Sequence, residues 1–160
     1  MKNLKIVAWA VMLLMVITGC EPVGGDTKPG GDTKPGDDAN QAVVCGEWSL
    51  VEWNGEAPVF HVYVKFDNNG AFEIYQQVWD FNYELYKGEY TLSGDVLSGV
   101  YEDGKALACE YQVEVKEDKL YMYSKEDDFS VTSVYEKCAI PMEVITEATT
   151  TRSDDVVPFL

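Results

Sequence analysis

The sequence is poor in histidine, a side chain on which many catalytic and metal sites depend. Its single histidine, His61, falls in an alternating segment, on the side expected to face solvent. No serine, histidine and acidic set with supporting spacing can be assembled around it. Asp127-Asp128 and Asp154-Asp155 lack the spacing of a calcium loop. The sequence therefore predicts no catalytic residue, no metal site and no cofactor, and favours a protein that is not an enzyme.

Basic charge is also scarce. The chain has 12 lysines and arginines against 28 aspartates and glutamates, a net charge of −16. Residues 1–19 contain two of the lysines and no acid, so the remainder has 10 basic and 28 acidic residues and a net charge of −18. Such a surface repels phosphate backbones and anionic lipid headgroups. A nucleic-acid partner is excluded on this ground.

The first 19 residues have the pattern of a secretory signal peptide. Lys2 and Lys5 precede an uncharged apolar run, 6–17, that is short for a membrane span. The segment Val16-Ile17-Thr18-Gly19-Cys20 resembles a bacterial lipobox, although Ile17 stands where that motif usually has leucine. The resemblance implies cleavage before Cys20 and its acylation. We expect an outer-membrane lipoprotein in the cell envelope of a Gram-negative bacterium, on either the periplasmic or the surface face. The alternative is an ordinary signal peptide.

Residues 20–44 are expected to be a flexible tether behind the lipidated cysteine. Gly24-Gly25-Asp26-Thr27-Lys28-Pro29 recurs almost unchanged as Gly30-Gly31-Asp32-Thr33-Lys34-Pro35. A mixture of glycine, proline and aspartate has nothing to bury and acts as a spacer.

Composition changes sharply at Cys45. Three tryptophans, all ten tyrosines and five of the six phenylalanines lie between Cys45 and Cys138. These rings can form a hydrophobic core without a metal. No amphipathic helix is evident, and short segments with strand patterns follow one another between turn signals. The pattern predicts an all-β domain at 45–141, either a closed eight-stranded up-and-down antiparallel barrel or a sandwich. The expected strands are 46–53, 58–67, 71–77, 85–93, 96–101, 106–115, 119–125 and 129–138.

Two hairpins fix the expected register. The loop 68–70 pairs Phe66 with Phe72 and Val64 with Ile74 on one face. The loop 94–95 pairs Leu92 with Leu97 and sets Tyr90 and Tyr101 across from glycines, an arrangement typical of curved sheets. A three-residue turn at 102–104 then places Leu107 beside Gly99 and Cys109 beside Leu97.

The outward positions in these registers are polar. They include Lys65, Glu73, Glu89, Glu110, Gln112 and Glu114. A membrane-spanning barrel has apolar side chains outside. The sequence thus argues against an outer-membrane pore.

Several motifs together resemble the lipocalin-like lipoproteins of Gram-negative anaerobes, and Gly46-x-Trp48 resembles the lipocalin opening motif. The resemblance covers 45–141, implies a barrel and a small apolar ligand, and leaves 142–160 as a tail. Lipocalins pack an arginine near the last strand on the tryptophan, whereas the only arginine here is Arg152, in the tail. The motifs are Trp48-x-Leu50-x-x-Trp53-Asn54-Gly55, Phe66-Asp67-Asn68-Asn69-Gly70-x-Phe72-x-x-Tyr75, Gly88-x-Tyr90-x-Leu92, Leu97-Ser98-Gly99-x-Tyr101-x-Asp103-Gly104 and Ile140-Pro141.

Three cysteines remain after Cys20. In a closed meander the first and last strands are neighbours, which brings Cys45 and Cys138 to the same rim. We predict a disulfide between them and a buried thiol at Cys109; the alternative is three reduced core cysteines.

The inward positions give the candidate ligand wall. A hollow barrel would bind a small hydrophobic or amphipathic molecule, and a filled barrel would instead be a surface module for protein interaction. The sequence leaves the oligomeric state open. The candidate wall consists of Trp48, Phe66, Phe72, Ile74, Tyr90, Leu92, Leu97, Tyr101 and Tyr111, with Trp79 and Phe81 at the mouth.

Overall fold

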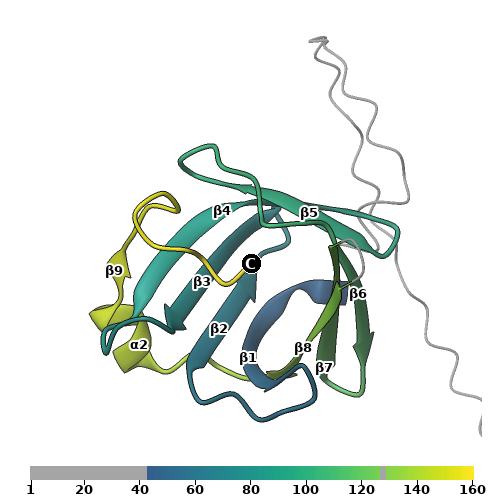
Figure 1. Ribbon diagram of the computed structural model, residues 1–160, viewed down its shortest axis with the longest axis horizontal. Coiled ribbons are helices and arrows are strands. Elements are labelled where there is room, and N and C mark those ends of the chain that lie inside the picture. Colours follow the sequence, from purple (N-terminus) through teal and green to yellow (C-terminus); the bar gives the residue numbers. More distant parts are fainter. Residues whose placement is uncertain (1–42, 127–128) are drawn as a thin grey trace, which may run out of the picture. The chain divides into compact units, whose positions relative to one another are not determined.

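The computed structural model describes residues 43–126 and 129–160. Eight antiparallel strands run up and down around a barrel (Figure 1). Consecutive strands pair with each other, and the first strand pairs with the eighth, so the sheet closes on itself. The predicted eight-stranded up-and-down barrel is therefore confirmed. The strands are β1 (Gly46–Trp53), β2 (His61–Phe66), β3 (Ala71–Gln77), β4 (Glu84–Ser93), β5 (Val96–Tyr101), β6 (Tyr111–Lys116), β7 (Lys119–Glu126) and β8 (Phe129–Lys137).

The hairpin of β2 and β3 has the predicted register. Phe66 pairs with Phe72 and Val64 with Ile74, and all four side chains are buried inside the barrel. On the outer face Glu73 forms an ion pair with Lys87 of β4, with 2.9 Å between the Glu73 Oε1 atom and the Lys87 ammonium nitrogen. Apolar side chains therefore fill one face of this sheet and charged side chains cover the other.

The second hairpin also has its predicted register, and a glycine explains its curvature. Gly88 of β4 pairs with Phe72 on one side and Tyr101 on the other. The Phe72 ring lies over Gly88, so a Cβ atom there would be 2.5 Å from the Phe72 Cζ atom. The Phe72 and Tyr101 rings meet edge to face, 5.5 Å between centroids. The absence of a side chain at Gly88 lets two aromatic rings pack across the barrel wall.

The strand predicted at 106–115 is shorter in the structure. Leu107 lies beside Gly99 as expected, and its N–H donates to the Gly99 carbonyl at 3.0 Å. Leu97, however, pairs with Tyr111 and not with Cys109. The five residues 107–111 thus face only three residues of β5, 97–99, and the two extra residues form an irregular segment before β6. The prediction missed this bulge because 106–109 is a short apolar run without a glycine or proline to interrupt a strand.

One end of the barrel is filled by side chains. This closed end carries the turns 67–70, 94–95 and 117–118. Trp48 is 1% exposed there, and its indole N–H donates to the Val44 carbonyl at 2.9 Å. The Lys137 ammonium lies 5.8 Å from the Trp48 ring centroid. A lysine at the end of β8 thus lies over the face of the buried tryptophan.

The chain after β8 wraps the outside of the barrel and then turns inward. α2 (Met142–Glu147) buries Val144 against Tyr75 and Leu85 on the outer face of β3 and β4. β9 (Thr149–Thr150) adds to β4 in parallel, and Figure 1 shows the yellow tail leading from β9 to the C label. Among the described residues, no helix has the length and apolar character needed to cross a membrane.

Candidate functional site

A cavity lies at the other end of the barrel, which we call the open end. The loops 54–60, 78–83 and 102–110 connect the strands there. The cavity has a volume of about 540 Å³ and opens to solvent. Its lining comes from strand ends, from these loops and from the last residues of the chain: Trp53, Phe60, Val78, Trp79, Ala108, Cys109, Tyr111, Ser124, Val131, Ser133 and 157–160.

Aromatic rings form one wall of the cavity. Trp53, at the end of β1, meets Phe60 edge to face with 5.4 Å between ring centroids. Phe159 of the tail packs against both rings, at 6.1 Å from Trp53 and 5.7 Å from Phe60. The ends of β1 and β2 supply the first two rings because these strands are paired neighbours. The wall is apolar and rigid, as in most small-molecule sites.

Uncharged polar groups lie on the opposite wall. Ser124 of β7 and Ser133 of β8 follow the inward register of Met122 and Tyr135. The Ser124 hydroxyl donates to the Val131 carbonyl at 3.4 Å. Burial raises the pKa of the Tyr111 phenol, with the neighbouring Cys109 adding to the rise. These hydroxyls are therefore neutral hydrogen-bonding groups over the physiological range.

The Tyr135 hydroxyl is fully buried near this wall. Among the residues that the structure describes, none meets hydrogen-bond geometry with it, and the Ser133 hydroxyl is its polar neighbour. Burial raises the Tyr135 pKa, and the nearby Ser133 hydroxyl opposes that rise. A buried hydroxyl without a good partner costs free energy, so this position is a weak point of the packing.

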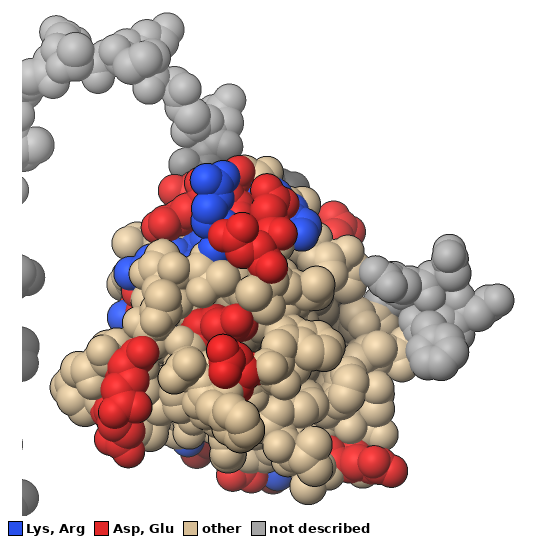
Figure 2. Space-filling model, turned by 60° about the vertical axis from the view of Figure 1, so that its left-hand side comes forward, with Lys and Arg blue, Asp and Glu red and all other residues tan. Residues whose placement is uncertain are grey.

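The lining residues include no aspartate, glutamate, lysine, arginine or histidine. Charged side chains lie on the outer surface instead. Figure 2 shows acidic and basic side chains gathered at one end of the face it presents, with further acidic side chains separated by broad uncharged areas. Among the described lining residues, the cavity can hold an apolar body and hydrogen-bond a neutral polar group.

The structure moves the candidate wall to different residues. Of the eleven residues expected, Trp79 and Tyr111 line the cavity. Phe81 is exposed at the loop between β3 and β4, outside the lining. The other eight are packed in the core: Trp48, Phe66, Phe72, Ile74, Tyr90, Leu92, Leu97 and Tyr101. The correction has a simple cause, because large rings at these inward positions fill the space between the strands.

Sequence reasoning missed the aromatic wall and the two serines. Ser124 and Ser133 stand at inward positions of otherwise apolar strands, and small polar residues in an inward register could have indicated a cavity. Phe60 lies just before β2 and Phe159 in the tail, where no strand period applies.

The structure does not contain the expected disulfide between Cys45 and Cys138. The Cys138 N–H donates to the Glu47 carbonyl at 2.9 Å, so Cys138 lies beside Glu47, two residues beyond Cys45. The Cys45 sulfur lies 3.6 Å from the Tyr90 hydroxyl. The two cysteines share a rim as expected, but the register offsets them. Cys109 is partly buried, at the cavity.

No family model matches the chain, and no curated protein matches it. Among solved structures, a lipocalin-like protein from Bacteroides uniformis is 19% identical, with a TM-score of 0.46 over 59% of this chain and 98% of that one. Fatty-acid-binding protein 1 of Echinococcus granulosus is 12% identical, with a TM-score of 0.39 over 61% of this chain and 99% of that one. This chain is similar to both in part, and no ligand is carried over from either.

Proposed function

We propose that the protein binds a small hydrophobic or amphipathic molecule at the open end of the barrel. The observation that carries the proposal is the cavity itself. Its volume of about 540 Å³ falls within the range of small-molecule sites, which is roughly 300–1,000 Å³. Such sites combine apolar walls with a few polar groups that orient the ligand. The aromatic wall and the serine wall supply these two parts.

The polar groups favour a neutral head group. A carboxylate buried among the lining residues would have no cationic side chain as partner, and an unpaired buried charge is costly. A hydroxyl, carbonyl or ester can instead bond the hydroxyls of Ser124 and Ser133, which line the cavity. The proposed ligand is thus an amphiphile with a neutral polar end, its apolar part against Trp53 and Phe60. The proposed role is binding, without catalysis.

We further propose that the barrel works outside the cytoplasm, attached to a membrane through acyl chains on Cys20. Cys20, the signal peptide and the tether lie outside the described residues, so the lipobox pattern alone supports this part. An anchored barrel would stay close to a membrane, where apolar ligands concentrate.

The alternative role, a surface module for protein interaction, has one observation in its favour. Apolar side chains are exposed around the open end, with Trp79 at 68% and Phe81 at 94%. Exposed aromatic residues of this kind are common in protein interfaces.

A cavity-filling substitution separates the two roles. N-phenyl-1-naphthylamine, a neutral fluorescent apolar probe, is titrated into the parent protein, into Val131→Phe and into Thr132→Phe. Val131 lines the cavity, whereas Thr132 is its neighbour in β8 and is not among the lining residues. We expect saturable fluorescence with the parent and Thr132→Phe, and at least about tenfold weaker binding to Val131→Phe. Equal binding to all three, or none to the parent, would count against the cavity and leave the interaction role.

A further inference from the structure

The last twelve residues follow a course that ends inside the barrel. β9 runs along β4, where the Thr151 N–H donates to the Leu85 carbonyl at 2.9 Å. The chain then crosses the ends of β4 and β5 and enters the open end. Leu160 is 2% exposed there, inside the same core cluster as Trp48. A segment distant in sequence from every barrel strand except β8 thus occupies part of the interior.

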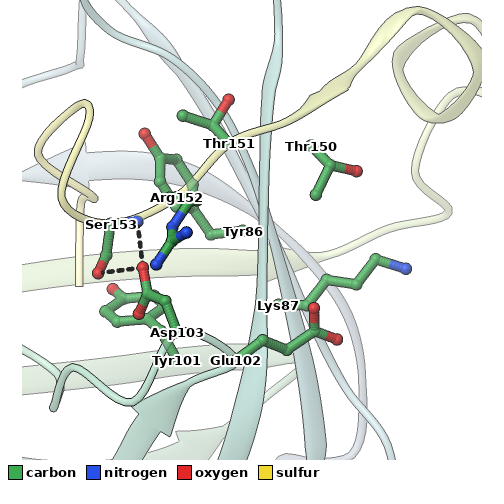
Figure 3. A pocket seen from close by; sticks show the side chains of 9 residues that line it. All are labelled: Tyr86, Lys87, Tyr101, Glu102, Asp103, Thr150, Thr151, Arg152 and Ser153. Carbon is green, nitrogen blue, oxygen red and sulfur yellow. Dashed lines mark hydrogen bonds between the residues drawn. The ribbon is translucent and has the colours of Figure 1, made fainter.

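An acidic side chain holds this segment just before it enters. Asp103 Oδ2 accepts a hydrogen bond from the Ser153 N–H at 2.7 Å and from the Ser153 hydroxyl at 2.8 Å (Figure 3). The Lys105 ammonium donates to the Ser153 carbonyl at 3.1 Å. Asp103 and Lys105 both belong to the turn after β5, so this turn clamps the segment at Ser153.

Beyond the clamp, one buried amide binds the backbone of the segment. Gln76 of β3 has no exposed area. Its Nε2 donates to the Val157 carbonyl at 3.1 Å, and its Oε1 accepts from the Phe159 N–H at 2.8 Å. Nε2 also donates to Glu84 Oε2 at 3.0 Å. Because both Nε2 partners are acceptors and the Oε1 partner is a donor, the network fixes the orientation of the amide.

This contact has the geometry of strand pairing. The Gln76 amide binds the Val157 carbonyl and the N–H of Phe159, two residues later. One residue of a neighbouring parallel strand would bind the same two groups. Pro158 lies between them and has no N–H that would need a partner. The Tyr86 hydroxyl donates to the Val156 carbonyl at 3.3 Å and the Tyr101 hydroxyl donates to the Leu160 carbonyl. Barrel side chains therefore bind three carbonyls and one N–H of the segment.

The side chains of the segment have separate places. Phe159 packs between Trp53 and Phe60, and Leu160 lies deeper. Val157 is largely exposed, so its side chain faces away. Backbone hydrogen bonds combined with pockets for particular side chains are how proteins bind extended peptides.

We propose that the open end of the barrel is a recognition site for an extended peptide of the type proline, aromatic, aliphatic, and that 156–160 is its built-in occupant. The buried Gln76 amide carries the inference, because without such a peptide two of its three hydrogen bonds have no partner. The same segment supplied as a separate peptide occupies the site when the built-in copy is displaced. The site shares residues 157–160 with the lining of the cavity proposed for a small molecule, but the inference does not require a small molecule to bind there.

Competition from the attached segment sets the design of the test. An attached segment acts at an effective concentration in the millimolar range, so a free peptide binds the parent chain poorly. Phe159→Asp in the full chain displaces the attached copy, since it places a charge between two aromatic rings. The probe is a fluorescein-labelled peptide with the sequence of residues 155–160, amidated at its end so that no terminal charge contributes.

Fluorescence anisotropy then measures binding of this peptide. We expect saturable binding to Phe159→Asp, at least about tenfold tighter than to the parent. An N-methyl group on the phenylalanine nitrogen of the peptide removes the donor to Gln76 and should weaken binding at least about tenfold. Gln76→Leu in the same background should have a similar effect. The matched Gln112→Leu should have none, because Gln112 lies on the outer face bonded to Asp95.

Equal binding to Phe159→Asp and the parent would overturn the proposal, as would full binding of the N-methylated peptide. If a variant does not fold, the parent chain supplies a second measurement. Its Phe159 amide should exchange with solvent at least about tenfold more slowly than in an unstructured peptide. Exchange at the unstructured rate overturns the proposal. Naphthylamine binding without peptide binding defeats this inference alone, and the reverse result defeats the small-molecule proposal alone.

Discussion

Gly88→Ala tests the packing of the closed half of the barrel. A Cβ atom at this position would lie 2.2 Å from the Val100 carbonyl oxygen and 2.5 Å from Phe72 Cζ. Carbon atoms pack best at about 3.5–4.0 Å, so these atoms would have to separate by more than about 1 Å. Neither can move freely, because the oxygen belongs to the β5 backbone and the buried Phe72 ring packs against Tyr101. We expect a loss of about 3 kcal/mol in the free energy of unfolding, at the upper end for overpacked cores.

Thermal and urea unfolding, followed by circular dichroism, measure this loss. A loss of about 3 kcal/mol corresponds to a fall in Tm of roughly 10–20 °C. Gly104→Ala is the matched control, because a Cβ atom there meets nothing within 4 Å. Its cost comes only from the positive φ of 89° and should be about 1 kcal/mol. In addition, Phe72→Leu combined with Gly88→Ala should cost less than the sum of the two single changes. Equal losses for Gly88→Ala and Gly104→Ala would refute the reasoning.

Three further predictions concern the clamp, the tyrosines and the anchor. Hydrogen bonds from Ser153 hold the Asp103 pKa below its usual value. The clamp should therefore be intact at any pH above the usual aspartate pKa and be lost as the pH falls through the lowered pKa of Asp103. The Ser153 amide resonance should shift only at acidic pH, and in Asp103→Asn it should not respond to pH in this range. Burial raises the pKa of Tyr101 and Tyr111 in the folded state. The stability that this contributes is fully present below about pH 10, the pKa of an unfolded tyrosine, and falls above it. Absorbance at about 295 nm should show these phenols ionising only as the protein unfolds, and full ionisation of a folded barrel near pH 10 would contradict their burial. Metabolic labelling with a radioactive fatty acid should mark the parent and leave Cys20→Ala unlabelled, and equal labelling of both would remove the anchor from the account.

The sequence determined the barrel more fully than it determined the site. The alternation in 61–66 and 71–77, with loop residues that suit a tight turn, predicts the register that pairs Phe66 with Phe72, and the structure has that register. Such local signals exist because a shift by one residue would expose the whole apolar face. The bulge before Tyr111 carried no such signal.

The position of the cavity depended on volume, which alternation does not measure. Phe66, Tyr90 and Tyr101 point into the barrel, as does the cavity residue Ser133. The volumes of the packed side chains decide which part of the interior is filled and which is left as a cavity. The aromatic wall required Phe159, which lies more than a hundred residues from Trp53 in the sequence. Contacts of that separation follow from the tertiary course of the tail, which neither strand period nor turn residues specify.

Photoaffinity labelling tests most directly the claim that the open end binds an amphiphile. A long-chain alcohol carrying a diazirine near its end is irradiated with the folded protein, and the labelled residues are mapped by mass spectrometry. The account predicts saturable labelling on the lining segments around Trp79, 108–111 and 131–133, reduced by excess unlabelled alcohol and by Val131→Phe. Labelling confined to the closed end around 66–72, or surface labelling that does not saturate, would contradict it.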